Sequence, residues 1–294
     1  MAGIVQNPYG YDPKINPEAA LLRRNTVLQK MLEQGFITED QYDEGIKEAL
    51  PAASEISPPK IDSEAPYFTS WVRQQLVDRY GAGRTFFGGL KIKTTLDLDV
   101  QNAAQDVIYN TIGGIGPAAS AVIINNKDAT IEAMVAGTDF DTAPFNLATQ
   151  GYRQPGSTIK AFILATALDQ GISPEAVYAS APQEFHFGKR GQETFVVKNY
   201  GDSYAGTSSL TSATTNSDNS VYAQVGLESI KGGPKAIART LHKFGVSDHI
   251  GVNPAMVLGT SEVTPLQWTC AWSTLANDGN RVSGTLAPDP GDDP

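Results

Sequence analysis

The spacing of apolar residues predicts two short helices at the start of the chain. A stripe suited to one face of a helix is formed by Leu21, Leu22, Leu28, Met31 and Leu32. Gly35 would end this helix. Thr38 and Gln41 have the spacing of a capping box for a second helix. We therefore expect a helical pair within residues 1–50. Residues 51–66 are rich in proline, serine and small side chains, which is typical of a linker.

The next part of the chain mixes helical and strand periodicity. We expect helices from Pro66 to about Tyr80 and over 97–112, a strand over 90–96, and a hairpin from the apolar runs 119–125 and 130–136. A further apolar run follows Ser157 and predicts a helix that is buried on most sides. We expect the hairpin to supply strands to the sheet against which this helix packs.

The remaining chain is predicted to be mostly helical. The stretch between two polar motifs, 154–160 and 214–222, has many Gly, Ser and Tyr residues and short β-like runs such as 194–197, and we expect a loop-rich helical lobe there. Helices are expected over 221–230 and 236–244, separated by a glycine-rich boundary. Residues 283–294 are rich in Pro, Gly and Asp, and we expect a disordered tail.

Composition and charge exclude several classes of function. The 294 residues carry a formal net charge of −10, which argues against nucleic acid as a partner. No apolar run is long enough to span a membrane, so we expect no transmembrane segment and a chain that is soluble by itself. Cys270 is the only cysteine and has no intrachain disulfide partner, and the three histidines lack metal-ligand spacing. No metal or cofactor is expected.

The run Gln154–Lys160 carries the first candidate chemistry. Pro155 and Gly156 predict a turn, and Ser157 and Lys160 are three residues apart, which places them on one face of a helix. Burial lowers a lysine pKa, and a neutral amine beside a hydroxyl can take its proton and make serine a nucleophile. The alternative is a helix cap with a lysine that extends to solvent. Ser57 to Lys60 repeats the spacing in the proline-rich linker, so spacing alone is weak.

A second polar motif follows in the stretch 214–222. Ser217 could relay a proton to or from Lys160, and the amide of Asn219 could hold a substrate carbonyl. The alternative is an ordinary turn, since Ser, Asp and Asn all favour turns. The two motifs in this order are similar to the Ser-x-x-Lys and Ser-Asp-Asn motifs of penicillin-binding proteins and class A β-lactamases.

The flanking sequences extend this resemblance to most of the chain. The approach to the serine over 145–157, the stretch 199–210 before the second motif, and the later stretch 255–282 resemble class A, or bifunctional, penicillin-binding proteins. The first residues and Arg23-Arg24-Asn25 resemble the end of the glycosyltransferase domain of that family. No copy of the acidic catalytic motif of that domain is present, so we expect no glycosyltransferase activity.

The resemblance implies an α+β fold of the penicillin-binding and β-lactamase-like transpeptidase type. Such a fold has an antiparallel sheet flanked by helices, here preceded by a small helical segment and lacking the C-terminal strands. The implied domains are the glycosyltransferase tail over 1–50, the linker over 51–66, a partial transpeptidase domain over 67–282, and the tail over 283–294.

The resemblance also implies a D,D-transpeptidase that cross-links peptidoglycan stem peptides. Ser157 would form the acyl-enzyme, Lys160 would be its general base, Ser217 would deliver a proton to the leaving group, and Asn219 would bind the acyl chain. The implied partners are stem peptides on lipid-linked glycan strands, and β-lactam antibiotics that acylate the same serine. The parent protein would act at the extracytoplasmic face of a bacterial cell membrane.

One element of the family pattern is absent from this sequence. The third motif, Lys followed by Ser or Thr and then Gly, does not occur in the 294 residues. Lys231-Gly232-Gly233 is not a substitute, because a proline follows it and it matches a helix boundary. In the family that motif lies on a strand that donates an oxyanion-hole N–H, and loss of one such donor costs about 10²–10³ in rate. We therefore expect a fragment of a longer enzyme whose own turnover is reduced or absent.

Three alternatives stay open at the level of the sequence. The first is a serine β-lactamase or D,D-carboxypeptidase, although no Glu lies in a recognisable setting for deacylation. The second is a non-catalytic fragment that binds penicillin or peptide. The third is a chain that does not fold stably by itself.

Overall fold

The computed structural model describes residues 6–7, 10–56, 63–188, 191–282 and 284. The chain divides into two compact units, Met1–Asp62 and Ser63–Pro294. The predicted tail over 283–294 lies outside the described residues except for Gly284.

The first unit contains the expected helical pair, α2 (Pro17–Glu33) and α3 (Glu39–Lys47). The capping box is confirmed, because Thr38 accepts the N–H of Gln41 while the Gln41 side chain accepts the N–H of Thr38. The apolar stripe does not form a core. Leu22 is 70% exposed, and Ala20 is the buried residue of α2, while α3 has none. Two helices are too few to enclose a core of their own.

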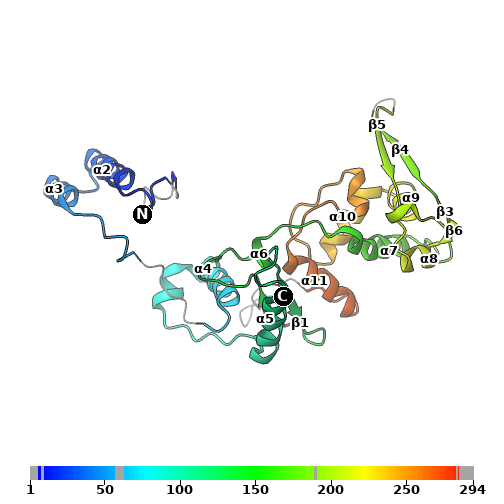
Figure 1. Ribbon diagram of the computed structural model, residues 1–294, viewed down its shortest axis with the longest axis horizontal. Helices are drawn as coiled ribbons and strands as arrows, with labels where there is room; N and C mark the ends of the chain where they lie inside the picture. The colour runs from blue at the N-terminus through cyan, green and yellow to red at the C-terminus, as the bar shows by residue number, and fades with distance from the viewer. Residues whose placement is uncertain (1–5, 8–9, 57–62, 189–190, 283, 285–294) are drawn as a thin grey trace. The chain divides into compact units, whose positions relative to one another are not determined.

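The second unit begins with a layer of helices around a β-hairpin (Figure 1). Its elements are α4 (Pro66–Phe87), α5 (Leu98–Ile112), β1 (Ala121–Ile124), β2 (Ile131–Val135) and α6 (Leu147–Gln150). The predicted hairpin is confirmed, with Val122 paired antiparallel to Met134. Helices α4 and α5 both pack on β2. A hydrophobic cluster fills the space between them, with Phe68, Val72, Leu76, Ile131 and Met134 among its buried members.

The expected strand over 90–96 is wrong. The segment joins the hairpin only near its end, where Thr95 donates from Oγ1 to the carbonyl of Ile131 at 2.7 Å and Asp97 donates from its N–H to Glu132 at 2.9 Å. Two contacts are too few to make a ladder. The first stretch of α4 ends as expected after Tyr80, since the backbone of Gly81 is non-helical with φ 79°, and a second helical stretch follows to Phe87.

A second hydrophobic cluster surrounds α7 (Lys160–Asp169), the helix that follows Ser157. It includes α8 (Leu210–Thr215), α9 (Asn219–Gln224), the π-helix η3 (Val225–Ser229), α10 (Gly233–Lys243) and the 3₁₀ helix η4 (Pro254–Leu258). Helix α7 packs on α10, η3 and η4. The hairpin belongs to the other cluster, so the expectation that α7 packs against it is wrong.

The expected helical lobe before the second motif is instead built from short strands. These are β3 (Val177–Ser180) with β6 (Gly206–Ser209), and β4 (Gln183–Phe187) with β5 (Glu193–Val197), each pair antiparallel. Figure 1 shows β4 and β5 extending together from the helices of this unit. Their Phe185 and Val197 side chains are buried in the second cluster. Some glycines and serines of this stretch lie within the strands, as Ser180 does in β3 and Gly206 in β6, so their presence did not indicate loops or helix ends.

Helix α11 (Pro265–Ala276) joins the two clusters of the second unit. Leu266 and Cys270 belong to the first cluster, while Ala271 and Trp268 pack with the second. Cys270 is a buried free thiol, as expected, and burial raises its pKa to about 12. Within the described ranges, no helix is long and apolar enough to cross a bilayer.

Candidate active site

Ser157 lies in a turn that is held by a distant part of the chain. Arg153 and Val263 exchange backbone hydrogen bonds of 3.0 Å in both directions, and Gly156 donates its N–H to Gly259 at 3.1 Å. Ser157 then falls in the 3₁₀ helix η1 (Gly156–Ile159) rather than in the first turn of the α-helix. The N–H of Lys160 donates to the carbonyl of Ser157, which places the two residues on one side of this turn. Among the described contacts, no hydrogen bond joins the Ser157 hydroxyl to the Lys160 amine.

A tryptophan that the sequence did not single out also holds this turn. Trp268 donates from Nε1 to Oγ1 of Thr158 at 2.9 Å. The Thr158 hydroxyl in turn donates to the carbonyl of Pro155 at 2.6 Å. Helix α11 therefore contacts the residue next to Ser157 directly.

Lys160 is the first residue of α7 and is 4% exposed, whereas Ser157 is exposed. The Lys160 ammonium donates to the carbonyl of Ser217 at 2.7 Å, to Oγ of Ser217 at 3.0 Å and to Oδ1 of Asn219 at 2.7 Å. An ammonium group has three donors, and here three acceptors surround it. The structure thus brings Lys160, Ser217 and Asn219 together, although the two motifs are far apart in sequence.

The surroundings of Lys160 favour a partly neutral amine. Burial lowers the pKa of Lys160 from its ordinary value to about 8, and the nearby carboxylate of Asp218 opposes this shift. The Tyr222 ring, whose centre lies 5.5 Å from Nζ, likewise favours the charged form, so burial alone accounts for the lowered pKa. A neutral amine keeps two N–H donors and gains a lone pair that can accept a proton.

The backbone of Ser217 has an uncommon conformation that aims it at Lys160. Its φ is +53°, in the left-handed region where glycine is usual. The N–H of Ser217 donates to Thr214 at 3.2 Å and the N–H of Asp218 donates to Ala213 at 2.9 Å, which together form a Schellman motif at the end of α8. This motif turns the carbonyl and the hydroxyl of Ser217 toward the amine.

Asp218 carries a buried charge close to Lys160, and the sequence did not single out this role. Its carboxylate accepts from Oγ of Ser180 at 2.6 Å, from Oγ of Ser220 at 2.7 Å and from the N–H of Val221 at 3.0 Å. Burial pushes the pKa of Asp218 upward, but these hydrogen bonds hold it below its ordinary value. Asp218 therefore caps α9 as a carboxylate and places a negative charge near Lys160. Its position before an apolar helix was the available sign of a cap.

Asn219 is held at both ends of its side-chain amide. Oδ1 accepts from Lys160, while Nδ2 donates to the carbonyl of Lys198 at 3.1 Å. An amide nitrogen carries two N–H groups, so one of them is left for a substrate carbonyl among the described contacts.

The described residues offer no alternative centre based on a metal. Within the described parts of the chain, no group of three or more His, Cys, Asp or Glu is arranged to hold an ion. His242 instead makes a 2.8 Å contact from Nδ1 to the carbonyl of Val246.

Comparison with known proteins identifies the class to which this fold and site belong. The family model of the penicillin-binding protein transpeptidase domain matches residues 119–288. The chain belongs to this family.

Individual relatives agree with this assignment. The chain is 32% identical to penicillin-binding protein 2D of Bacillus subtilis (strain 168), over 97% of this chain and 41% of the relative. It is 28% identical to penicillin-binding protein 1A of Neisseria lactamica, over 96% of this chain and 48% of the relative. The chain thus spans less than half the length of these two curated relatives.

Solved structures show the same fold. The penicillin-binding protein PonA1 from Mycobacterium tuberculosis matches 74% of this chain and 58% of its own with a TM-score of 0.64 and 25% identity. Penicillin-binding protein 1A from Haemophilus influenzae matches 93% of this chain and 55% of its own with a TM-score of 0.60 and 24% identity. The expected α+β penicillin-binding transpeptidase fold is therefore confirmed, although the described strands form separate two-stranded antiparallel pairs rather than one sheet.

Proposed function

We propose that the site performs serine acyl transfer on peptidoglycan stem peptides, as a D,D-transpeptidase. The single observation that supports this most strongly is the contact of the buried Lys160 amine with both Ser217 and Asn219. Family membership supports the reaction class. The assignment of roles to individual residues rests on their geometry.

The proposed reaction begins with Ser157. Its Oγ attacks the carbonyl carbon of the penultimate D-Ala while neutral Lys160 takes the hydroxyl proton. The C–N bond to the terminal D-Ala breaks, and its nitrogen receives a proton from the Lys160 ammonium through the Ser217 hydroxyl, which lies 3.0 Å from Nζ. A hydroxyl can accept one proton while donating another, which suits Ser217 to this relay. An amine of a neighbouring peptide then attacks the acyl carbon, and neutral Lys160 takes the amine proton. The C–O bond to Ser157 breaks, and the Lys160 ammonium returns the proton to Ser157 Oγ.

Asn219 would orient the acyl chain through its second amide N–H. The backbone N–H of Ser157 would be one donor to the developing oxyanion. β-Lactams would acylate the same serine. One relative of this fold, PonA1, has been solved in complex with penicillin V.

The wider setting follows from the substrate. Peptidoglycan is assembled outside the bacterial membrane, so we propose that the parent protein acts on that face. Residues 1–50 would be the end of a glycosyltransferase domain, followed by the linker over 51–66 and a partial transpeptidase domain over 67–282.

A labelling experiment tests the proposal directly. The folded chain is mixed with a fluorescent penicillin and its intact mass is followed over time, beside Ser157→Ala and Ser57→Ala. The second variant removes the serine of the other Ser-x-x-Lys sequence. We expect a stable adduct in the wild type and in Ser57→Ala, and none in Ser157→Ala.

The other outcomes separate the alternatives. Rapid release of the adduct would favour a β-lactamase or carboxypeptidase. Reversible binding without an adduct would favour a non-catalytic fragment. Absence of both in a protein with a cooperative thermal transition would overturn the proposal for this chain.

A further inference from the structure

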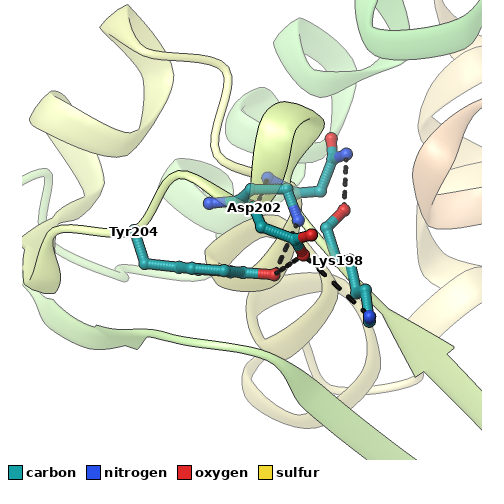
Figure 2. A network of polar contacts seen from close by, with 5 residues as sticks. Lys198, Asp202 and Tyr204 are labelled. Atoms are coloured by element: carbon teal, nitrogen blue, oxygen red, sulfur yellow. Dashed lines mark hydrogen bonds and ion pairs between the residues drawn. The ribbon is translucent and has the colours of Figure 1, made fainter.

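Residues 198–204 form a tightly bonded loop beside the second motif (Figure 2). The N–H of Asn199 donates to the hydroxyl of Tyr204 at 3.2 Å, and Nδ2 of Asn199 donates to the carbonyl of Ser203 at 2.9 Å. The Tyr204 hydroxyl contacts Oδ1 of Asp202 at 3.4 Å, and Lys198 lies 4.0 Å from the same carboxylate. The loop therefore closes on itself and fixes the orientation of the Asn199 side chain.

The oxygen of the Asn199 side chain contacts the first residues of α9. Its Oδ1 accepts the N–H of Asn219 at 2.9 Å and the N–H of Ser220 at 3.0 Å. The neighbouring carbonyl of Lys198 accepts from the Asn219 side chain at 3.1 Å. The loop thus holds both the backbone and the side chain of Asn219, whose Oδ1 contacts Lys160.

These bonds complete the N-terminus of α9. The first N–H groups of a helix have no partner within it. The carboxylate of Asp218 accepts the N–H of Val221, and the backbone carbonyl of Asp218 accepts the N–H of Tyr222. Asn199 takes the two that remain, those of Asn219 and Ser220. Ser220 is fully buried, so its N–H would have no ready access to water if Asn199 were absent.

We infer that Asn199 is a positioning residue, which fixes the amide of Asn219 and through it the site of the Lys160 amine. Lys160 lies between Asn219 on one side and the backbone of Ser217 on the other. Removal of the Asn199 acceptor frees the first turn of α9 to move away from Lys160. The role of Asn199 in catalysis rests on the proposed function. The link from Asn199 through Asn219 to the Lys160 amine does not.

The test compares three variants by NMR, without any ligand. Asn199→Ala removes the acceptor. Asn199→Asp keeps an acceptor for the N–H groups of Asn219 and Ser220, adds a negative charge, and loses the donor to the carbonyl of Ser203. Tyr200→Ala changes a 98% exposed side chain of the same loop and is the matched control. The measurements are amide exchange at Asn219 and Ser220, and the titration of Lys160.

Asn199→Ala should speed exchange at Asn219 and Ser220 by about tenfold or more, because two hydrogen bonds of a buried turn are lost. It should also lower the pKa of Lys160. As α9 moves, Lys160 loses Oδ1 of Asn219, an acceptor that stabilises its charged form. Asn199→Asp should keep both amides protected and raise the pKa of Lys160. The other ionisable groups facing Lys160 are Asp218 and Tyr222. Asn199 also lowers the pKa of Asp218 through a side-chain hydrogen bond, so the titration of Asp218 is followed in the same variants. Tyr200→Ala should match the wild type.

Two outcomes would overturn the inference. One is an unchanged Lys160 titration in both Asn199 variants. The other is a general loss of protection in Asn199→Ala together with an unmoved titration in Asn199→Asp, which would assign Asn199 to loop stability alone. None of these measurements requires acylation of Ser157, so the failure of the proposed reaction would leave their result intact.

Discussion

The backbone of Gly259 lies directly against the backbone of Gly156, the residue before Ser157. The N–H of Gly156 donates to the carbonyl of Gly259 at 3.1 Å. A Cβ on Gly259 would collide with the carbonyl oxygen of Gly156 and lie 2.6 Å from its nitrogen, and the φ of Gly259 is +79°. Only glycine meets both conditions, so this turn sets the position of the serine.

Gly259→Ala should therefore damage both stability and labelling. The left-handed backbone and the backbone collision should together cost about 2–4 kcal/mol of unfolding free energy. A small displacement of Ser157 should slow penicillin acylation by about 10²-fold. Gly171→Ala is the matched control, since Gly171 has φ +80° but open space around its Cβ position. Denaturant unfolding and labelling rates measure both effects, and equal losses in the two variants would contradict the argument.

Two substitutions of Ser217 separate the strain of its backbone from the role of its hydroxyl. Both Ser217→Gly and Ser217→Ala remove the hydroxyl that contacts Lys160, so both should label slowly. Glycine relieves the left-handed conformation at φ +53°, whereas alanine does not. We expect Ser217→Gly to be more stable than Ser217→Ala by about 1 kcal/mol in urea unfolding. Equal stability of the two would mean that the Schellman turn carries no strain at this residue.

The pH dependence of labelling should follow Lys160. Its pKa of about 8 means that the neutral amine becomes scarcer by tenfold with each pH unit below that value. Acylation of Ser157 should therefore rise with pH and level off above about pH 8. Asp218 and Tyr222 face the same amine, but the pKa of Asp218 is lowered and that of Tyr222 is raised, so neither titrates in this range. Stopped-flow labelling between pH 6 and 9, in steps of about half a unit, provides the measurement. A rate that does not change over this range would exclude Lys160 as the base.

Much of the site was accessible from the sequence because its chemistry is carried by local motifs. The spacing of Ser157 and Lys160 and the later Ser217 and Asn219 predicted a shared site, and the structure brings the last three into contact. The turn at Gly156 and the burial of Cys270 also followed from local composition.

What could not be predicted depends on contacts between distant segments. Nothing near Gly259 or Trp268 indicates that they hold the turn of Ser157. The short runs before the second motif are compatible with loops, and only pairing across the sheet makes them strands. The segment 90–96 alternates like a strand, yet it joins its neighbour only at the end.

Asp218 caps α9 and carries a buried charge near Lys160, and Asp218→Asn changes both its hydrogen bonds and its charge. The two carboxylate oxygens of Asp218 now accept from the hydroxyls of Ser180 and Ser220, and the amide of Asn has only one oxygen. One of these buried hydroxyls would therefore face an N–H₂ group and lose its acceptor. We expect a loss of about 2–3 kcal/mol in unfolding free energy.

The same substitution should also move the pH profile. Asp218 raises the pKa of Lys160 by attraction, so its neutralisation should lower that pKa further and shift the rise of acylation toward lower pH. Asp169→Asn removes an equal charge from the exposed end of α7 and should leave both stability and profile unchanged. The measurements are urea unfolding and the labelling rate against pH for each protein. A profile that moves upward in Asp218→Asn, or moves equally in both variants, would show that the buried carboxylate does not set the protonation of Lys160.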